Sequence, residues 1–184
     1  ISPVGSPAGL MYGYLYEGTY KQSDFDITQN DNGTTVYTPK EGVVLFSNQS
    51  RPGDPRYTDI NDDGVINDED KTMIGEGHPK AIGGLNNNFV YKNFDLSFFF
   101  QFSLGNDLLN ANRMMFENPA GKRHTNMFAA YANRWTEENA LSDIPRSQAV
   151  GSQEYSSLYI EDGSFVRLKS LSLGYNFQPD KRTI

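Results

Sequence analysis

The stretch AIGGLNNNFVYKNFDLSFFFQFSLG, residues 81–105, decides the fold. In its second half every second position carries a large apolar side chain: Phe94, Leu96, Phe98, Phe100, Phe102 and Leu104. The positions between them are polar, with Phe99 as the exception. A helix would scatter these apolar side chains around its circumference, whereas an extended strand gathers them on one face. The alternation therefore predicts a β-strand with one apolar face and one mostly polar face.

A second extended run, residues 85–91, precedes this strand, and Lys92-Asn93 lies between the two. Because Asn tolerates the left-handed backbone of tight turns, the two runs are predicted to form a hairpin with Tyr91 and Phe94 beside the turn. Such a hairpin fits two environments. One is the core of a soluble sandwich, and the other is a membrane barrel whose apolar face meets lipid and whose polar face meets a wet lumen. A strand of about 9–11 residues has the length to cross a bilayer.

The last predicted strand is residues 164–177, SFVRLKSLSLGYNF. Its apolar residues alternate with small or polar ones: Leu171, Leu173, Tyr175 and Phe177. On strict alternation, Arg167 and Lys169 lie on this same face. A charge on a lipid-facing surface costs about 2–4 kcal/mol at the bilayer midplane and little near the edge. The strand is therefore expected to leave the membrane near Lys169, and a short turn is predicted at residues 178–180.

The composition excludes several classes of function. A net charge of −7 argues against a binding surface for nucleic acid or anionic lipid, because such surfaces need a basic stripe that neutralises phosphates. The absence of cysteine excludes disulfides, thiolate zinc sites and cysteine nucleophiles. The sequence has no apolar run of the length of a membrane helix and no signal-peptide pattern at its start. Because it opens on Ile1, we expect a piece of a longer protein.

Residues 59–70, DINDDGVINDED, match a twelve-position calcium loop. Alternating oxygens on a tightly curled backbone can supply the roughly six to eight ligands that a hard cation prefers. The predicted ligands are Asp59, Asn61, Asp63, the Val65 carbonyl, Asn67 and Asp70. Gly64 occupies the bend, and Ile66 is expected to point away from the cation and pack. Asp70 replaces the usual Glu, which shortens the reach and weakens binding. The alternative is an acidic turn that needs no metal.

The other segments are less regular. Residues 1–9 are predicted to form a loop, and residues 21–40 a polar segment that turns back on itself. The tyrosine-rich residues 11–20 fit either a half-buried strand or a tyrosine-lined surface loop. Residues 106–162 form a segment far longer than the usual connection of about 4–6 residues. Within it, residues 108–117 and 125–135 have helical spacing and good helix formers, and residues 68–73 offer one further helical turn.

Short turns alternate with long segments along the chain. This asymmetry, together with alternating strands and aromatic residues near strand ends, is typical of outer-membrane barrels with long loops outside the cell and short periplasmic turns. We therefore predict an all-β fold, a fragment of a membrane β-barrel with antiparallel up-and-down strands and extracellular loops that carry short helices. The predicted parts are an extracellular loop region (1–80), a transmembrane hairpin (81–105), a long extracellular loop (106–162), and a transmembrane strand with a periplasmic turn (163–184).

Short motifs along nearly the whole chain also resemble those of a known family. They are GSPAG (5–9), YGY (12–14), EG (17–18), GD (53–54), the loop 59–70 with IG (74–75), PK (79–80), GND (105–107), RWT (134–136), PR (145–146) and YIEDGSFVRLKSLSLGY (159–175). In their order and spacing they resemble the C-terminal barrel region of the SusC/RagA-type TonB-dependent outer-membrane transporters of Bacteroidetes.

The resemblance implies a closed barrel of about 22 strands with an N-terminal plug. It implies uptake, driven through TonB, of oligosaccharides or peptides too large for porins, in contact with outer-membrane lipid. The implied partner is a SusD-like surface lipoprotein. The plug that would contact TonB is not recognisable in these residues. In this family the extracellular loops shape the substrate chamber and meet the lipoprotein, so residues 106–162 are expected to make both contacts.

Two other classes of function remain as alternatives. An enzyme is not expected, because His78 and His124 lie in turn-like contexts without a nucleophile and an orienting carboxylate nearby in sequence. Glu137-Glu138 and the acidic loop do offer carboxylates for glycoside hydrolysis. The second alternative is a secreted, calcium-stabilised, carbohydrate-binding β-sandwich. A sandwich should be a soluble monomer, whereas barrel strands out of context should aggregate through unpaired edges.

Overall fold

The computed structural model of the chain describes residues 8–117 and 126–177. The chain falls into two compact units, Ile1–Gly75 with Leu109–Glu161, and Glu76–Leu108 with Asp162–Ile184. Within the described ranges, none of the helices combines the length and the apolar character that a membrane-spanning helix needs.

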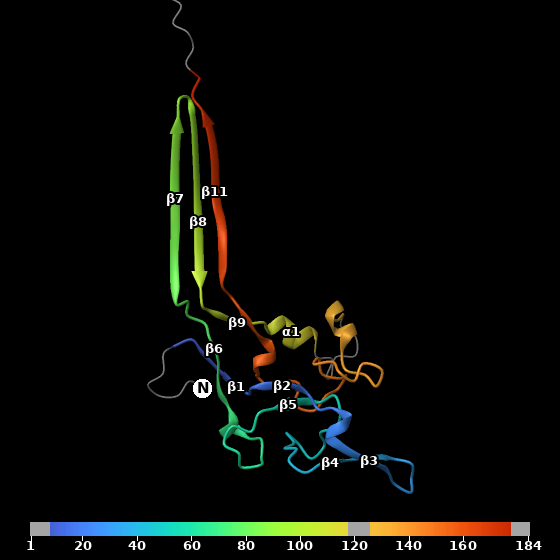
Figure 1. The fold of residues 1–184 in the computed structure, drawn as a ribbon. Coiled ribbons are helices and arrows are strands. Elements are labelled where there is room, and N and C mark those ends of the chain that lie inside the picture. Colours follow the sequence, from blue (N-terminus) through green and yellow to red (C-terminus); the bar gives the residue numbers. More distant parts are fainter. Residues whose placement is uncertain (1–7, 118–125, 178–184) are drawn as a thin grey trace, which may run out of the picture. The chain divides into compact units, whose positions relative to one another are not determined.

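The second unit is built on an antiparallel sheet of three long strands in the order β11-β8-β7 (Figure 1). β7 is Ala81–Tyr91, β8 is Phe94–Leu104 and β11 is Phe165–Tyr175, each of 11 residues. β7 and β8 pair without interruption from Tyr91 opposite Phe94 to Ala81 opposite Leu104. The predicted hairpin is thus confirmed, and its first strand begins four residues earlier than residue 85. Lys92, with φ of 53°, rather than Asn93 takes the left-handed backbone of the turn.

The two faces of this sheet differ in polarity. Residues directly opposite each other on antiparallel strands share a face, so the register assigns each side chain to one of them. The apolar face carries Leu85, Phe89 and Tyr91 of β7, the six alternating apolar residues of β8, and Val166, Leu168, Leu171, Leu173 and Tyr175 of β11. The polar face carries Asn86, Asn88, Asp95, Ser97, Gln101, Ser103, Ser170 and Ser172. β7 is less strictly divided, since Asn87 shares the apolar face.

A β-bulge at Lys169 corrects the prediction that Arg167 lies on the apolar face. Leu168 is opposite Phe100, and the next paired residue, Ser170, is opposite Phe99, so Lys169 is one extra residue in β11. A bulge of this kind shifts the alternation by one position. Arg167 therefore lies opposite Gln101 on the polar face, while Val166 and Leu168 extend the apolar face. The prediction was wrong because it assumed a strict period of two, and the apolar face continues past Lys169 to the start of the strand.

Phe99, the exception in the alternation of β8, packs across the sheet over a glycine. A Cβ atom added to Gly84 would lie 2.6 Å from the Phe99 ring, which shows that the ring occupies the space of a missing side chain. At the turn end of the sheet, the rings of Phe94 and Tyr175 lie 4.8 Å apart. β11 ends at Tyr175, two residues before the predicted end, and the turn predicted at 178–180 lies outside the described residues.

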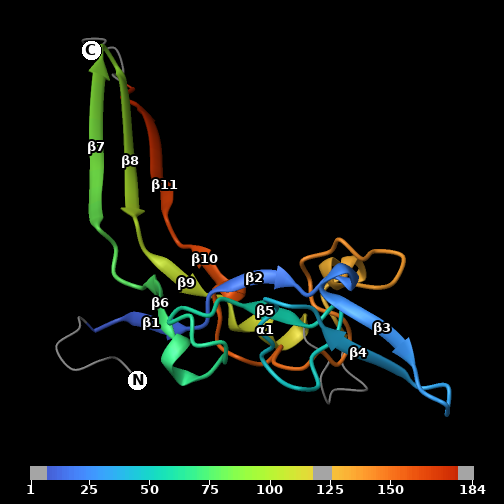
Figure 2. The ribbon, with the colours of Figure 1, turned by 60° about the horizontal axis from the view of Figure 1, so that its bottom comes forward.

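The first unit contains small two-stranded sheets. β1 (Leu10–Gly13) pairs with β6 (Thr72–Glu76), β2 (Tyr16–Thr19) with β5 (Pro55–Tyr57), and β3 (Phe25–Gln29) with β4 (Thr35–Pro39) (Figure 2). The β3–β4 hairpin confirms that residues 21–40 turn back on themselves. The tyrosine-rich segment 11–20 is divided between β1 and β2. A fourth pair joins β9 (Asp107–Leu109) to β10 (Ile160–Asp162).

The helices are short. α1 spans Ala111–Phe116, inside the predicted segment 108–117, and its amino end is capped by the side chain of Asn110, which accepts from the Arg113 N–H. The other predicted segment, 125–135, forms only the 3-10 helix η3 (Ala129–Asn133). It ends because the N–H of Trp135 donates to the Ile144 carbonyl at 2.8 Å instead of continuing the helix. Further 3-10 turns are η1 (Gln22–Asp24), η2 (Asp68–Asp70) and η4 (Ser157–Tyr159).

The core of the first unit is aromatic. Tyr14, Tyr57 and Ile66 form its buried centre, and Tyr16, Val44 and Phe46 pack against them. The Tyr14 and Tyr57 rings lie 5.0 Å apart, and Phe46 meets both edge-on. Ile66 lies at the eighth position of the acidic loop, and its burial confirms the expectation that it packs. Burial of this side chain fixes the loop to the core.

Candidate functional site

The acidic loop between Asp59 and Asp70 is curled by bonds from its own backbone to its side chains. Asp59 Oδ2 accepts from the Gly64 N–H at 2.8 Å, Asn61 Oδ1 from the Asp63 N–H at 3.1 Å, and Asp63 Oδ1 from the Val65 N–H at 2.8 Å. Gly64 takes a φ of 83°, which the bend requires and which glycine adopts without strain. The side chains at positions 1, 3 and 5 of the predicted site are thus held toward the inside of the loop.

Asp70 closes the loop at its last position. Its side chain is fully buried and accepts from two backbone N–H groups, that of Asn67 at 2.8 Å and that of Ile60 at 2.9 Å. Burial raises the pKa of the Asp70 carboxyl, but these hydrogen bonds outweigh burial and hold the pKa below its ordinary value. Asn67 in turn accepts from the Glu69 N–H at 2.7 Å and caps η2. Asp70 is therefore a carboxylate that ties both ends of the loop together.

One carboxylate oxygen of the loop has no partner. Asp59 Oδ1 is buried and accepts no hydrogen bond from any described residue. A buried carboxylate oxygen without a partner carries a desolvation cost, which a cation would offset. In residues 8–117 and 126–177, however, no three His, Cys, Asp or Glu side chains come close enough together to ligate one metal ion. The backbone of the predicted site is folded, whereas its carboxylates are not gathered around one point.

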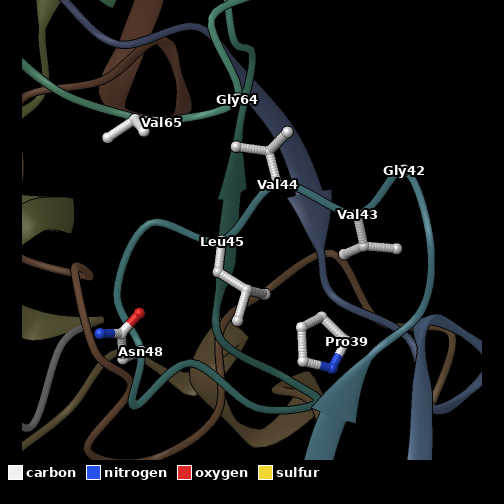
Figure 3. A pocket seen from close by; sticks show the side chains of 8 residues that line it. All are labelled: Pro39, Gly42, Val43, Val44, Leu45, Asn48, Gly64 and Val65. Atoms are coloured by element: carbon white, nitrogen blue, oxygen red, sulfur yellow. The ribbon is translucent and has the colours of Figure 1, made fainter.

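A cleft of about 390 Å³ borders the loop (Figure 3). The chain after β4 curves around it, and the loop contributes its bend from the opposite side. The lining residues are Pro39, Gly42, Val43, Val44, Leu45, Asn48, Gly64 and Val65. Residues 43–46 have no regular secondary structure; Val43, Val44 and Leu45 form a wall of this cleft, and Phe46 packs in the aromatic core.

Three motifs that are distant in the sequence meet at one buried ion pair. Arg146 Nε lies 2.7 Å from Asp54 Oδ1, and the Asp54 side chain is fully buried. The other Asp54 oxygen accepts from the Arg51 N–H at 3.0 Å, and the Val150 N–H donates to Oδ1 at 3.2 Å. Burial raises the pKa of the Asp54 carboxyl more than Arg146 and these N–H groups lower it. The pair joins the 51–54 turn to residues 146–150.

Gly53 and Trp135 pack next to this pair. A Cβ atom on Gly53 would lie 2.5 Å from the Trp135 ring, and Gly53 has a φ of 86°. The Gly53 carbonyl accepts from the Arg146 N–H at 2.8 Å. The GD, RWT and PR motifs therefore build one structural centre, which the sequence alone did not bring together.

The structure gives no support to a hydrolytic site. His78 is exposed and forms no hydrogen bond or ion pair with the other described residues, and His124 lies outside them. Glu137 and Glu138 are adjacent, exposed residues of a turn. Glycosidases need two carboxyl groups that flank the scissile bond at a separation of about 5–10 Å, a geometry that two neighbouring surface residues do not provide.

Comparisons with known proteins identify the family to which the chain belongs. No family model matches the chain. TonB-dependent receptor P3 from Formosa agariphila is 36% identical over 172 residues, or 94% of this chain and 15% of that receptor. TonB-dependent receptor SusC from Bacteroides thetaiotaomicron is 30% identical over 177 residues, or 85% of this chain and 16% of SusC. The chain is homologous to the TonB-dependent receptors.

A solved structure of the RagAB peptide transporter has the same fold as this TonB-dependent receptor segment. The TM-score is 0.60 at 22% identity, over 90% of this chain and 16% of that chain. The all-β class is thereby confirmed, and barrel strands replace the sandwich alternative. The chain spans 15–16% of the length of the two curated receptors that it matches. Both of these relatives are receptors rather than enzymes.

Proposed function

We propose that the chain supplies barrel strands and extracellular loops to a TonB-dependent importer of the outer membrane. The carrying observation is the three-stranded sheet with one continuous apolar face and one polar face. Strands of 11 residues are about 36 Å long, and a tilt of about 45° reduces this to the roughly 25 Å of an outer-membrane apolar band. The apolar face would meet lipid, and the polar face would line the lumen.

The proposal includes the partners and the direction of the loops. Residues 1–80 and 106–162 would lie outside the cell and meet a SusD-like surface lipoprotein, while TonB would act through a plug. The substrate would be an oligosaccharide or a peptide. The solved RagAB structure is that of a peptide transporter, which supports the peptide class, while the oligosaccharide class and the lipoprotein partner rest on the family resemblance of the motifs.

An epitope tag tests this function. We expect a tag inserted after Gly42, an exposed residue with open space around it, to be labelled by antibody on intact cells, with the receptor in the outer-membrane fraction. A second tag in the Lys92-Asn93 turn should be labelled only after the outer membrane is opened. Labelling of the Lys92-Asn93 tag on intact cells would reverse the direction of the strands, and a receptor recovered in the soluble fraction would contradict the barrel.

We further propose a structural calcium ion in the loop 59–70, held by Asp59, Asn61, Asp63, the Val65 carbonyl, Asn67 and Asp70. The order of these oxygens and the unpartnered Asp59 Oδ1 support it. The ion would replace internal hydrogen bonds of the acidic side chains and would gather oxygens that now point to the loop backbone. Bound there, it would brace the wall of the neighbouring cleft, since Gly64 and Val65 line that cleft.

Calorimetry tests the calcium site. We expect calcium to bind the wild-type chain with measurable heat, and Asp63→Ala to weaken binding at least about tenfold, which is about 1.4 kcal/mol, because a ligand at position 5 is removed. Asp62→Asn is the matched control. It lies in the same loop at a non-ligand position, and its φ of 56° suits Asn. Equal binding by both variants, or no heat with the wild type, would refute the site.

A further inference from the structure

Two cations of β11 share the polar face of the sheet. Arg167 is opposite Gln101 by register. Lys169 is the extra residue of the bulge, and in such a bulge two residues of one strand oppose one residue of the partner. The register fixes Ser170 opposite Phe99, and we assign Lys169, which has no paired residue of its own, to the polar side beside Ser170. The guanidinium of Arg167 lies 5.1 Å from the centre of the Phe165 ring, which belongs to the same face and holds the charge there.

Neither cation is neutralised. No Asp or Glu in the described ranges forms an ion pair with Arg167 or Lys169, and both side chains are exposed. The lack of an ion pair does not follow from a lack of acidic residues, since the chain has 23 acidic and 16 basic residues. β7, β8 and β11 contain a single acidic residue, Asp95, which is opposite Gly174 near the turn. From Asp95 to Gln101 is about 20 Å at about 3.3 Å per residue.

At that separation Asp95 does not offset the two charges, because the screening length is about 8 Å at physiological ionic strength. The cations are flanked instead by the Gln101 amide and the Ser170 hydroxyl on the same face, and Arg167 also by the Phe165 ring. Guanidinium and ammonium groups beside neutral hydrogen-bonding groups and an aromatic face suit an anionic group such as a carboxylate.

We propose that Arg167 and Lys169 form an anion-attracting site on the polar face, which takes a carboxylate-bearing solute as it passes along the sheet. This inference rests on the proposed function, in which the polar face lines an aqueous lumen. Beyond that function, it specifies that β11 recognises a negatively charged group of the substrate. The bulge is what creates the site, because without it Lys169 and Ser170 would not lie on the same face.

Cysteine reactivity in the receptor in outer-membrane vesicles tests the site, and the chain itself contributes no cysteine. Ser170→Cys is introduced and modified with two methanethiosulfonate reagents, one carrying a sulfonate and one a trimethylammonium, each rate being divided by that for a free thiol. We expect the sulfonate to react about tenfold faster, the lower end of electrostatic steering. Arg167→Gln with Lys169→Gln should abolish this preference. Lys92→Gln, which removes a cation at the turn, should preserve it.

A second measurement asks whether the site holds a carboxylate. Added succinate should slow the sulfonate reagent at Ser170→Cys, and should no longer do so in the Arg167→Gln, Lys169→Gln background. Equal rates for the two reagents would mean that an acidic group from elsewhere in the receptor neutralises the cations, and the proposal would be overturned. Absence of protection by succinate would also overturn it.

Leu171→Cys separates this proposal from the proposed function. Leu171 lies on the apolar face, and in a lipid-facing position it should react with neither reagent. If it reacts while Ser170→Cys does not, the faces are reversed, and both the barrel orientation and the anion site fail. If Leu171→Cys is silent and Ser170→Cys reacts without charge preference, the barrel orientation stands and the anion site alone fails.

Discussion

Replacing Gly53 with Ala should destabilise the first unit strongly. The new Cβ would lie 2.5 Å from the Trp135 ring, and the backbone has a φ of 86°. We expect a loss of roughly 2–5 kcal/mol in the free energy of unfolding, about 1–2 from the left-handed backbone and about 1–3 from overpacking. Trp135 is the single tryptophan of the chain, so its fluorescence reports directly on this contact. Chemical unfolding followed at the tryptophan emission measures the loss, and the folded emission should shift to longer wavelength.

Gly42→Ala is the matched control for this substitution. Gly42 has a φ of 82°, nearly that of Gly53, but a Cβ added there meets no atom within 4 Å. It should therefore show only the backbone cost of about 1–2 kcal/mol and no change in emission. If both variants lose the same stability, the contact between Gly53 and Trp135 contributes nothing, and the positive φ explains the whole effect.

Replacing Arg146 with Met should cost about 3–5 kcal/mol of stability at pH 7, because it leaves a buried carboxylate without its partner. The Asp54 side chain has no contact with solvent and Arg146 Nε lies 2.7 Å from its Oδ1. Water therefore cannot replace the lost guanidinium. The same unfolding experiment measures it. The control is Arg56→Met, which breaks the pair between Arg56 and Glu17 at 3.0 Å. That pair is about 40% solvent-exposed on each side, and its loss should cost about 1 kcal/mol or less.

The deficit of Arg146→Met should depend on pH with a definite sign. Burial already raises the pKa of Asp54 above its ordinary value with Arg146 in place, and removal of the guanidinium raises the pKa further. A carboxyl whose pKa is higher in the folded state favours folding when it is protonated. The deficit should therefore be complete above the folded-state pKa of Asp54 in the variant, shrink as the pH falls from there to the folded-state pKa of Asp54 in the wild type, and stay constant below it. A deficit that grows on acidification would contradict the assignment of Asp54 as the orphaned group.

The long strands could be predicted from the sequence because one physical pattern dominates them. In β8 six alternating apolar residues and a two-residue turn fix the face, the register and the hairpin together. The short strands of the first unit carry no such pattern. β2 and β5 pair over a few residues, and their pairing depends on the aromatic packing of Tyr14, Tyr16 and Tyr57 rather than on any local periodicity. The structure of segments that depend on contacts with residues distant in the sequence cannot be predicted from a short stretch of that sequence.

The candidate sites also differ in whether their residues are close together in the sequence or are brought together by the tertiary fold. The loop 59–70 was found because its oxygens are close in sequence, and its folded backbone follows from those same residues. The centre at Asp54 and Arg146 was visible only as separate motifs, since the two residues are brought together by the tertiary fold. The face of Arg167 was assigned wrongly, because a bulge leaves no mark in composition. Only the pairing of Leu168 and Ser170 with consecutive residues of β8 reveals it.

Lys169 also determines how this strand can change in evolution. Deleting that one residue would place Leu168, which is opposite Phe100, directly before Ser170, which is opposite Phe99, so the strand would pair without a bulge and residues 165–168 would keep their faces. A single-residue gap in the middle of a strand usually exchanges the faces of its side chains, but here it would remove only the unpaired residue and leave the surroundings of the four preceding side chains unchanged. Related receptors that lack a residue at this point should therefore carry the apolar and charged residues of positions 165–168 in the same order.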